Sequence, residues 1–235
     1  ITMLPMQEYE LFSVRENDVI VKKNGVFLHA PKPLKTISSA VYNAGIGWYK
    51  TFVNRIVNPE YEFNHVEKEV EQFLAGEQLE KTESVVMLTA IDPTTAIVKT
   101  YTQAELSILI VVTAGVGNAI DASKAQLRNE KPYAGTINTW VIINGNLTNE
   151  AFVQAMITAT EAKSKALQEE QIFDTVSETI ATGTGTDSLL IAATQTGSSY
   201  QYAGPLTALG QLIGYSVCDA TRKAIQNYKQ KSERN

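Results

Sequence analysis

Apolar runs and short alternating segments predict several strands in the first half of the chain. β-branched runs at 19–22 and 26–29 flank Asn24-Gly25, a pair that tolerates positive φ and favours a hairpin turn. Strands are also expected at 11–14 and 37–42, the second followed by a sharp turn at the glycines of 43–47. Runs at 84–90, 96–101 and 106–113 predict three more strands. Two of these are almost continuously apolar, which indicates burial on both faces.

Helical periodicity becomes prominent later. Asn64 is a candidate cap for a surface helix to about residue 74, and Thr148 for a long helix to about residue 171. Strands are expected at 136–144 and 188–194, before a final helix from Pro205 to about Lys229. The final helix carries an apolar stripe that we expect to face the core: Leu206, Leu209, Ile213, Val217 and Ala224. Gly210 and Gly214 on this helix would let another element approach closely.

Strands and helices interleave unevenly, with a strand-rich start and two long late helices. This order predicts an α+β or α/β fold with a mixed β-sheet and long C-terminal helices. The 235 residues, of which 44% are hydrophobic, are enough to bury a sizeable core. We therefore expect a single layered domain over residues 1–235.

Charge and cysteine content narrow the function. The formal net charge is −5 and no long run of Lys or Arg occurs, so binding to nucleic acid or to an anionic membrane is disfavoured. The apolar runs are shorter than the ~20 residues that span a bilayer. Cys218 is the single cysteine, which excludes an internal disulfide and suits a reducing cytoplasm. Residues 1–4 lack the pattern typical of a targeting segment, although the chain opens on Ile rather than Met.

The long helix at 148–171 places a lysine inside its apolar stripe. At 100° per residue, Lys163 lies within about 20° of Phe152 on the helical wheel, so its ammonium should point toward the interior or a cleft. The stem could simply pack while the charge reaches water, or the lysine could be functional. Glu161 lies nearly opposite Phe152, where a solvated carboxylate is common. The pattern favours Lys163 over Glu161.

A Gly/Thr loop at 181–187 precedes the apolar strand at 188–194. Gly183 and Gly185 allow a close backbone approach to a ligand, and Asp187 offers a carboxylate near the hydroxyls of Thr184 and Thr186. The loop lacks the Gly-Lys-Ser/Thr ending of a phosphate-binding loop. An ordinary turn is the alternative interpretation, because these residue types are common in turns.

Loops that follow strands supply further candidates for ligand binding. Asn43 and Gly45 follow one predicted strand, and Asn118 follows another, in positions where layered α/β folds often bind ligands. Turn chemistry alone would also explain each of them.

Familiar catalytic signatures are mostly absent. His29 and His65 lack metal-ligand spacing, and both are expected to be structural or exposed. Cys218 lies among apolar residues of the final helix and is better explained as a small hydrophobe than as a nucleophile. No Gly-x-Ser-x-Gly elbow occurs.

Four blocks of sequence resemble, in order and spacing, the adenosylcobinamide amidohydrolase family. They are Gly135-Thr-Ile-Asn138, Ile157-Thr-Ala-Thr-Glu-Ala-Lys163 with Ala166-Leu-Gln168, Ala181-Thr-Gly-Thr-Gly-Thr-Asp187 and Leu209-Gly-Gln-Leu-Ile-Gly214. The segments at 38–45 and 112–118 also look like blocks of this family, so the resemblance extends from about residue 36 to 225. The resemblance implies hydrolysis of the aminopropanol amide of adenosylcobinamide to adenosylcobyric acid, a step in corrinoid salvage for coenzyme B12.

Amide hydrolysis requires an attacking group, a stabiliser for the oxyanion and an acid for the leaving amine. Our hypothesis assigns these roles to side chains that must then share one cleft. Asp187 would orient or deprotonate water or the hydroxyl of Thr184 or Thr186, and Lys163 would stabilise negative charge or protonate the leaving nitrogen. The candidates for substrate binding are Asn43, Gly45, Asn118, Asn138, Thr160, Glu161, Gly183 and Gly185.

The resemblance also implies a small-molecule corrinoid as the partner. The corrinoid carries its own cobalt, so no protein-bound metal or other cofactor is expected. Symmetric dimers are the commonest oligomers, and this prior favours a homodimer. Two other functions compete: a non-catalytic corrinoid carrier or sensor, and a hydrolase of a different small molecule, since a fold does not define a substrate.

Overall fold

One large mixed sheet organises the protein. The computed structural model describes residues 13–129 and 135–233. The strand order is β4-β3-β2-β13-β8-β6-β5, with β1 paired to β2. Within this sheet, as far as the described residues show it, β3–β4 and β13–β8 pair in parallel and the other strand pairs are antiparallel. The strands are β1 (Val19–Lys22), β2 (Gly25–Ser38), β3 (Gly45–Ile56), β4 (Ser84–Thr89), β5 (Ile97–Gln103), β6 (Leu106–Ala114), β8 (Ile137–Ile143) and β13 (Ser188–Ala193).

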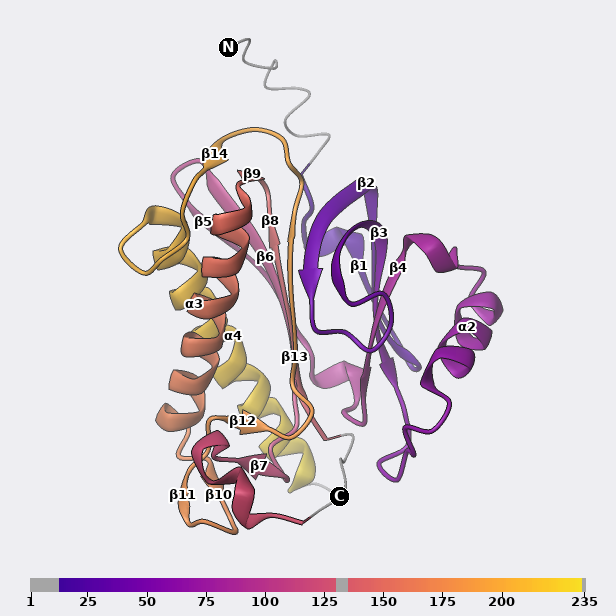
Figure 1. Ribbon diagram of the computed structural model, residues 1–235, viewed down its shortest axis with the longest axis vertical. Helices are drawn as coiled ribbons and strands as arrows, with labels where there is room; N and C mark the ends of the chain where they lie inside the picture. The colour runs from indigo at the N-terminus through magenta and orange to yellow at the C-terminus, as the bar shows by residue number, and fades with distance from the viewer. Residues whose placement is uncertain (1–12, 130–134, 234–235) are drawn as a thin grey trace.

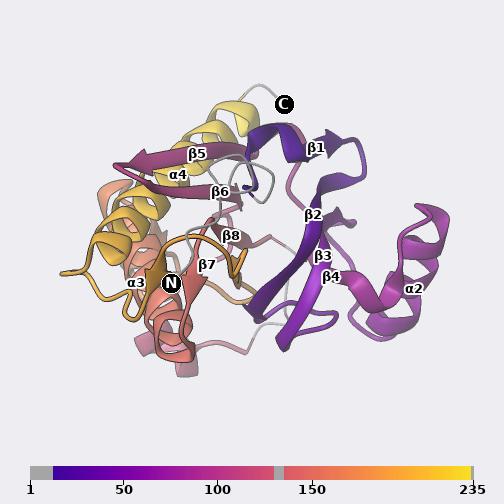
Figure 2. The ribbon, with the colours of Figure 1, turned by 90° about the horizontal axis from the view of Figure 1, so that it is seen from above.

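Within the described ranges, three helices cover this sheet (Figures 1 and 2). They are α2 (Val66–Gly76), α3 (Asn149–Glu169) and α4 (Ala208–Ser232). Three two-stranded ribbons complete the strands: β7 (Ala119–Ile120) with β12 (Gly183–Thr184), β9 (Asn146–Leu147) with β14 (Ser199–Tyr200), and β10 (Phe173–Asp174) with β11 (Thr179–Ile180). The 3₁₀ turns are η1 (Glu16–Asp18), η2 (Lys81–Glu83), η3 (Pro93–Thr95) and η4 (Ala122–Leu127).

The sheet curls back on itself, so the protein has four layers. One apolar core joins β2, β3 and β4 to β13, β8 and β6, and within it the rings of Phe52 and Trp140 have centroids 6.4 Å apart. A second core lies between α2 and the outer face of β2–β4. The third and largest packs α3 and α4 against β5, β6, β8 and β13. Figure 2 shows this helix–sheet–sheet–helix arrangement from above. Strands buried on both faces explain the continuous apolar runs of β6 and β8.

The fold class predicted from the sequence is confirmed: the sheet is mixed and the long helices are C-terminal. The hairpin between β1 and β2 is also confirmed, although its turn falls at residues 23–24 and Gly25 already opens β2. Gly25 has φ of +154°, and a Cβ there would lie 2.5 Å from the Asn54 carbonyl oxygen. Only part of the expected strand at 11–14 falls within the described residues.

The region after β2 corrects two predictions. The strand expected at 37–42 ends at Ser38, and both glycines expected to turn the chain at 43–47 belong to β3, which begins at Gly45. The chain instead turns over 39–44, where Asn43 adopts a φ of +53°. Strand β3 escaped detection because its first half is exposed and mixes glycine, aromatic and charged residues, so it shows no clean period-2 pattern.

Two helix starts also differ from the prediction. The first helix is capped at His65 rather than Asn64, and the last begins at Ala208, with Thr207 as its N-cap. Leu206, expected in the core, is therefore 96% exposed because it precedes the helix. The close approach expected at Gly210 is present, since a Cβ there would collide with the Gly204 carbonyl group. At Gly214 the nearest atom would be Thr158 Cγ2 at 3.8 Å, an ordinary contact.

Candidate functional site

A small pocket lies between α3 and the sheet, beside the amino ends of the parallel strands β8 and β13. Its volume is about 190 Å³. The lining residues are Ser39, Ile137, Thr139, Met156, Ala159, Thr160, Lys163, Asp187, Ser188 and Leu189. Because β8 and β13 are parallel neighbours, Asp187 just before β13 and Ile137 at the start of β8 meet at the same edge. Ser39, which directly follows the carboxyl end of β2, lies at this edge too, because β2 runs antiparallel to β13.

Lys163 projects from the inner face of α3 into this pocket. The face is built largely of alanines, which leave room for the long side chain beside the sheet. Its ammonium forms an ion pair with Asp187, and the two side chains are only 16% and 15% exposed. The helical wheel correctly predicted that Lys163 points into a cleft. The fold thus brings together two charged residues that are 24 positions apart in the sequence.

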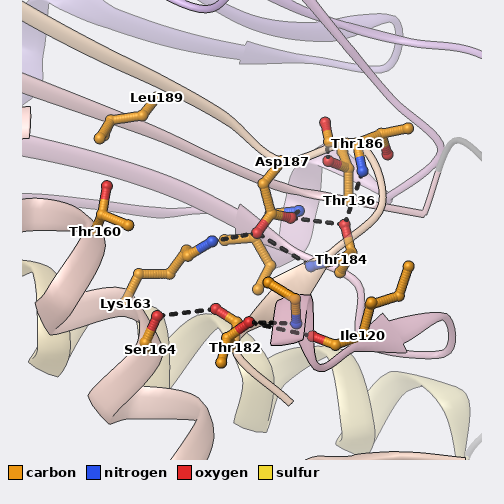
Figure 3. Close-up of polar contacts among 12 residues, drawn as sticks. Ile120, Thr136, Thr160, Lys163, Ser164, Thr182, Thr184, Thr186, Asp187 and Leu189 are labelled. Carbon is orange, nitrogen blue, oxygen red and sulfur yellow. Dashed lines mark hydrogen bonds and ion pairs between the residues drawn. The ribbon is translucent and has the colours of Figure 1, made fainter. Parts of the chain in front are cut away.

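Asp187 is the centre of the polar contacts at this edge (Figure 3). Its Oδ1 accepts hydrogen bonds from the Ile137 backbone N–H at 3.0 Å and from the Thr184 hydroxyl at 2.6 Å. Its Oδ2 accepts from the Thr184 backbone N–H at 3.1 Å and from the Lys163 ammonium. These donors compensate for the partial burial of the carboxylate and fix its orientation.

The Gly/Thr loop wraps around the ion pair. Residues Gly183 and Thr184 form β12, which pairs with β7. A Cβ at Gly183 would lie 2.6 Å from Lys163 Nζ and would also collide with Asp187 Oδ2, so any other residue there would displace the two charged groups. Thr186 contributes its carbonyl oxygen, which accepts from the Thr136 hydroxyl at 2.8 Å. Gly185 lies in the turn between β12 and Asp187.

Thr139 is a pocket residue that sequence reasoning missed. It lies in β8 and is 2% exposed, yet its hydroxyl has no hydrogen-bond partner among the described residues. An unpaired buried hydroxyl costs roughly 1–3 kcal/mol, so a partner supplied by a ligand or water would be favourable. The available signal was the polar pair Asn138-Thr139 inside an otherwise apolar strand. Of these two residues, only Asn138 is among the candidates predicted from the sequence.

Asn138 faces the other side of the sheet from the pocket. Its side-chain amide donates to Asn54 Oδ1 at 2.7 Å and to the Leu88 carbonyl at 2.9 Å, within the core between the two halves of the sheet. Because neighbouring residues of a strand point to opposite faces, Thr139 rather than Asn138 reaches the pocket. The structure therefore does not bring Asn138 to this pocket, and its predicted role in substrate binding stays a prediction.

The remaining candidates are dispersed. Thr160 lines the pocket, but its hydroxyl donates to the Met156 carbonyl. Asn43 uses its amide to hold the Lys81 and Ser84 carbonyls, and the adjacent Gly45 is exposed at the start of β3. Glu161 lines a separate depression of about 370 Å³ between α3 and α4. Asn118 lies in the loop before β7, outside the lining of the Lys163 pocket. The structure does not bring Asn43, Gly45, Asn118 or Glu161 to that pocket.

Cysteine and histidine take the positions expected of residues without a role in this pocket. Cys218 packs against the helix-side core, and burial raises the pKa of its thiol, which disfavours the reactive thiolate. His29 and His65 are exposed. Among residues 13–129 and 135–233, no group of three or more His, Cys, Asp or Glu side chains is placed to hold a metal.

In the same described ranges, no helix is both long and apolar enough to cross a membrane.

The fold and pocket define a layered α/β protein with a lysine–aspartate pair at a small polar site, and comparison with known proteins gives its family. A sequence model described as adenosylcobinamide amidohydrolase matches residues 9–233. The chain therefore belongs to the adenosylcobinamide amidohydrolase family, whose members are classed as hydrolases of amide bonds.

Curated relatives and solved structures show more distant similarities. The uncharacterized protein MJ1613 of Methanocaldococcus jannaschii is 43% identical over 96 residues, which are 40% of this chain and 37% of the relative. The uncharacterized ABC transporter ATP-binding protein YvrA of Bacillus subtilis is 24% identical over 212 residues, 88% of this chain and 38% of the relative. This chain thus spans less than two fifths of either relative.

Two solved structures align with most of the chain at low identity. The PH0078 protein from Pyrococcus horikoshii OT3 has a TM-score of 0.45 and 8% identity, covering 92% of this chain and 79% of its own. A β-aminopeptidase of Burkholderia sp. has a TM-score of 0.44 and 11% identity. Its alignment covers 92% of this chain and 80% of the β-aminopeptidase chain.

Proposed function

We propose that this chain hydrolyses the amide that joins aminopropanol to the corrin ring of adenosylcobinamide, releasing adenosylcobyric acid for coenzyme B12 assembly. Family membership supports the reaction class. The observation that carries the proposal to particular residues is the ion pair of Lys163 and Asp187 in the wall of the pocket. A charged acid–base pair held away from bulk water is suited to moving protons during amide hydrolysis.

In the proposed mechanism, water attacks the amide carbonyl carbon and Asp187 accepts a proton from that water. The carbonyl oxygen becomes an oxyanion, stabilised by the Lys163 ammonium and by the hydroxyl of Thr139, which donates to no other group among the described residues. Collapse of the tetrahedral intermediate breaks the C–N bond as Lys163 gives a proton to the leaving nitrogen. Transfer of a proton from Asp187 to Lys163 across their hydrogen bond then restores both groups.

Thr184 acts as a positioning residue in this mechanism. Its hydroxyl and backbone N–H both bind Asp187, and it is absent from the pocket lining, so it orients the carboxylate rather than attacking the substrate. The corrinoid supplies its own cobalt, and the proposed chemistry assigns no further cofactor. We also propose that the reaction takes place in the cytoplasm.

The test is turnover of adenosylcobinamide by the purified protein, with cobyric acid and free aminopropanol measured by mass spectrometry. Lys163→Ala and Asp187→Asn should each lower kcat by about 10²- to 10⁴-fold, the range usual for loss of an acid–base group. Lys165→Ala is the matched control, because Lys165 is on the same helix but 54% exposed and outside this pocket. It should retain the activity of the unmodified protein.

Other outcomes select other functions. Corrinoid binding with no product would indicate a carrier or sensor. Hydrolysis of simple amides without hydrolysis of adenosylcobinamide would indicate a different substrate. Equal activity of Lys163→Ala and Lys165→Ala would contradict the assigned role of Lys163.

A further inference from the structure

The first half of β3 exposes two large apolar side chains. Ile46 is 73% exposed and Trp48 is 56% exposed, whereas the second half of the strand buries Phe52 and Val53 in two cores. Exposed tryptophan beside exposed isoleucine is a common property of binding surfaces. We refer to Ile46 and Trp48 as the β3 shelf.

Strand pairing places the β3 shelf on the α3 side of the sheet. Ile46 is directly opposite Ile37, and Trp48 is opposite Lys35. Directly opposed residues of antiparallel strands project to the same face. Ile37 packs against the helix-side core, and Lys35 contacts α3 through Asn149 at 2.8 Å. Ile46 and Trp48 therefore face the same side as the pocket.

The shelf is also close to the pocket along the sheet. Pocket residue Leu189 on β13 is bonded to Ser39 at the end of β2, and β3 is the next strand outward. Two strand spacings of about 4.8 Å separate β13 from β3, which amounts to roughly 10 Å. On the opposite side of the pocket, α3 exposes Val153 at 52%, only about 20° on the helical wheel from the pocket residue Thr160.

The pocket is too small to enclose a corrinoid, so most of that ligand needs a binding surface outside the pocket. About 190 Å³ is below the roughly 300–1,000 Å³ of sites that enclose drug-sized ligands, and a corrinoid is larger still. The pocket can take the amide arm, and the macrocycle must then lie outside its mouth. A flat ring with apolar faces and peripheral amides matches an exposed indole and isoleucine bordered by the polar side chains of Lys35 and Ser39.

We propose that the β3 shelf, together with Val153, binds the macrocycle of the substrate while its amide arm enters the Lys163–Asp187 pocket. This inference rests on the proposed function and assigns to the shelf the discrimination between a corrinoid and a small amide. Substitutions at Ile46 or Trp48 should then weaken binding of the corrinoid. They should not alter the hydrolysis of an amide that is too small to reach the β3 shelf.

The test is equilibrium dialysis of the full chain with cobinamide, followed by the absorbance of the corrinoid. Trp48→Ala should raise Kd about tenfold, the equivalent of about 1.4 kcal/mol, and Ile46→Ala should raise it severalfold. Trp48→Phe should restore most of the affinity. Tyr215→Ala and Leu206→Ala are matched controls, because both side chains are exposed but lie on or just before α4. Both controls should bind as tightly as the unmodified protein.

The outcomes separate this inference from the function on which it rests. If the unmodified protein binds and cleaves the corrinoid but Trp48→Ala and Ile46→Ala match their controls, the shelf assignment is wrong and the function stands. If the unmodified protein neither binds nor cleaves a corrinoid, both fall. A uniform loss of turnover on a short N-(2-hydroxypropyl) amide in the shelf variants would also overturn the assignment, because it would show damage to the pocket itself.

Discussion

Thr139 is a residue at which stability and activity should separate. Its buried hydroxyl has no hydrogen-bond partner in the part of the chain that the structure describes, so Thr139→Val removes an unsatisfied polar atom at almost constant side-chain volume. We expect the free energy of unfolding to stay constant or rise by about 1 kcal/mol, while kcat for adenosylcobinamide falls by tenfold or more. Urea denaturation and steady-state kinetics measure the two quantities.

Thr221→Val is the matched control for this prediction. Thr221 is also buried, and its hydroxyl has no partner within residues 13–129 and 135–233, but it lies in α4 and outside the pocket. Its replacement should leave kcat unchanged, and Thr139→Ser, which keeps the hydroxyl, should retain most of the activity. A Thr139→Val protein with normal kcat would show that the hydroxyl does not contact the reacting carbonyl.

At the scale of elements, a buried ion pair connects Asp174 on β10 with Arg128, which follows η4. Arg128 donates to Asp174 at 2.5 Å, and the two side chains are 9% and 1% exposed. Asp174 also accepts from the backbone N–H groups of Asp121 and Val176. Burial alone would raise the pKa of Asp174, but the bonds from Arg128 and the backbone outweigh it and hold the pKa well below its usual range.

The sign of the resulting pH dependence follows from this shift. A carboxyl whose pKa is depressed by folding stabilises the folded state fully above its unfolded pKa of about 3.9, and that stabilisation is lost as pH falls toward the folded value. Asp174→Asn should therefore lower the free energy of unfolding at pH 7 by about 3–5 kcal/mol and flatten its dependence on pH below about 4. Chemical denaturation at pH 7 and pH 3 measures both effects.

Glu71→Gln provides the comparison. Its carboxylate is also paired, to Lys81, but both side chains are well exposed and the pair is screened by water. This variant should change stability little at either pH. If Asp174→Asn behaved in the same way, the buried pair would not be holding β10 in place.

At the scale of the whole molecule, a polar network links the two halves of the curled sheet. Asn138 on β8 donates to Asn54 on β3, and Asn54 donates in turn to Thr113 on β6 at 2.7 Å. Asn138→Ala would leave Asn54 Oδ1 and the Leu88 carbonyl buried without this donor, so we expect a loss of about 2–4 kcal/mol in the free energy of unfolding. Denaturation followed by far-UV circular dichroism and by tryptophan fluorescence measures it.

The same experiment tests the prediction of a single domain. Trp140 lies in the core between the two halves and Trp48 is 56% exposed, so in a Trp48→Phe background the fluorescence of Trp140 and the circular dichroism should change in one coincident transition. Because Asn138 faces away from the pocket, kcat per folded molecule should remain within about threefold of normal. A large fall in kcat at unchanged stability would return Asn138 to the catalytic site.

Local periodicity was sufficient to predict elements whose environment is uniform along their length. The runs of β4 and β6 indicated strands buried on both faces, and Thr148 identified the start of α3 through a cap that the structure confirms. The wheel position of Lys163 also followed from the sequence, because the direction of a side chain on a helix depends only on spacing.

Contacts between distant segments could not be predicted in this way. The meeting of Lys163 with Asp187 depends on α3 crossing β13, and the partner of Asn138 depends on the curl that brings β3 over β8. Strand β3 has no clean pattern because its two halves lie in different environments. For Asn138 and Thr139, sequence indicated polarity in a buried strand, but the pairing of β8 decided which of the two reached the pocket.

The sequence by itself therefore determined the class of fold, the long helices and the face of α3 that carries Lys163, because propensity and periodicity are properties of neighbouring residues. The tertiary structure alone decided the ion pair, the unpartnered hydroxyl of Thr139 and the position of the β3 shelf. These features depend on the registers and crossings of segments far apart in the chain, which are set by the burial of all three cores together.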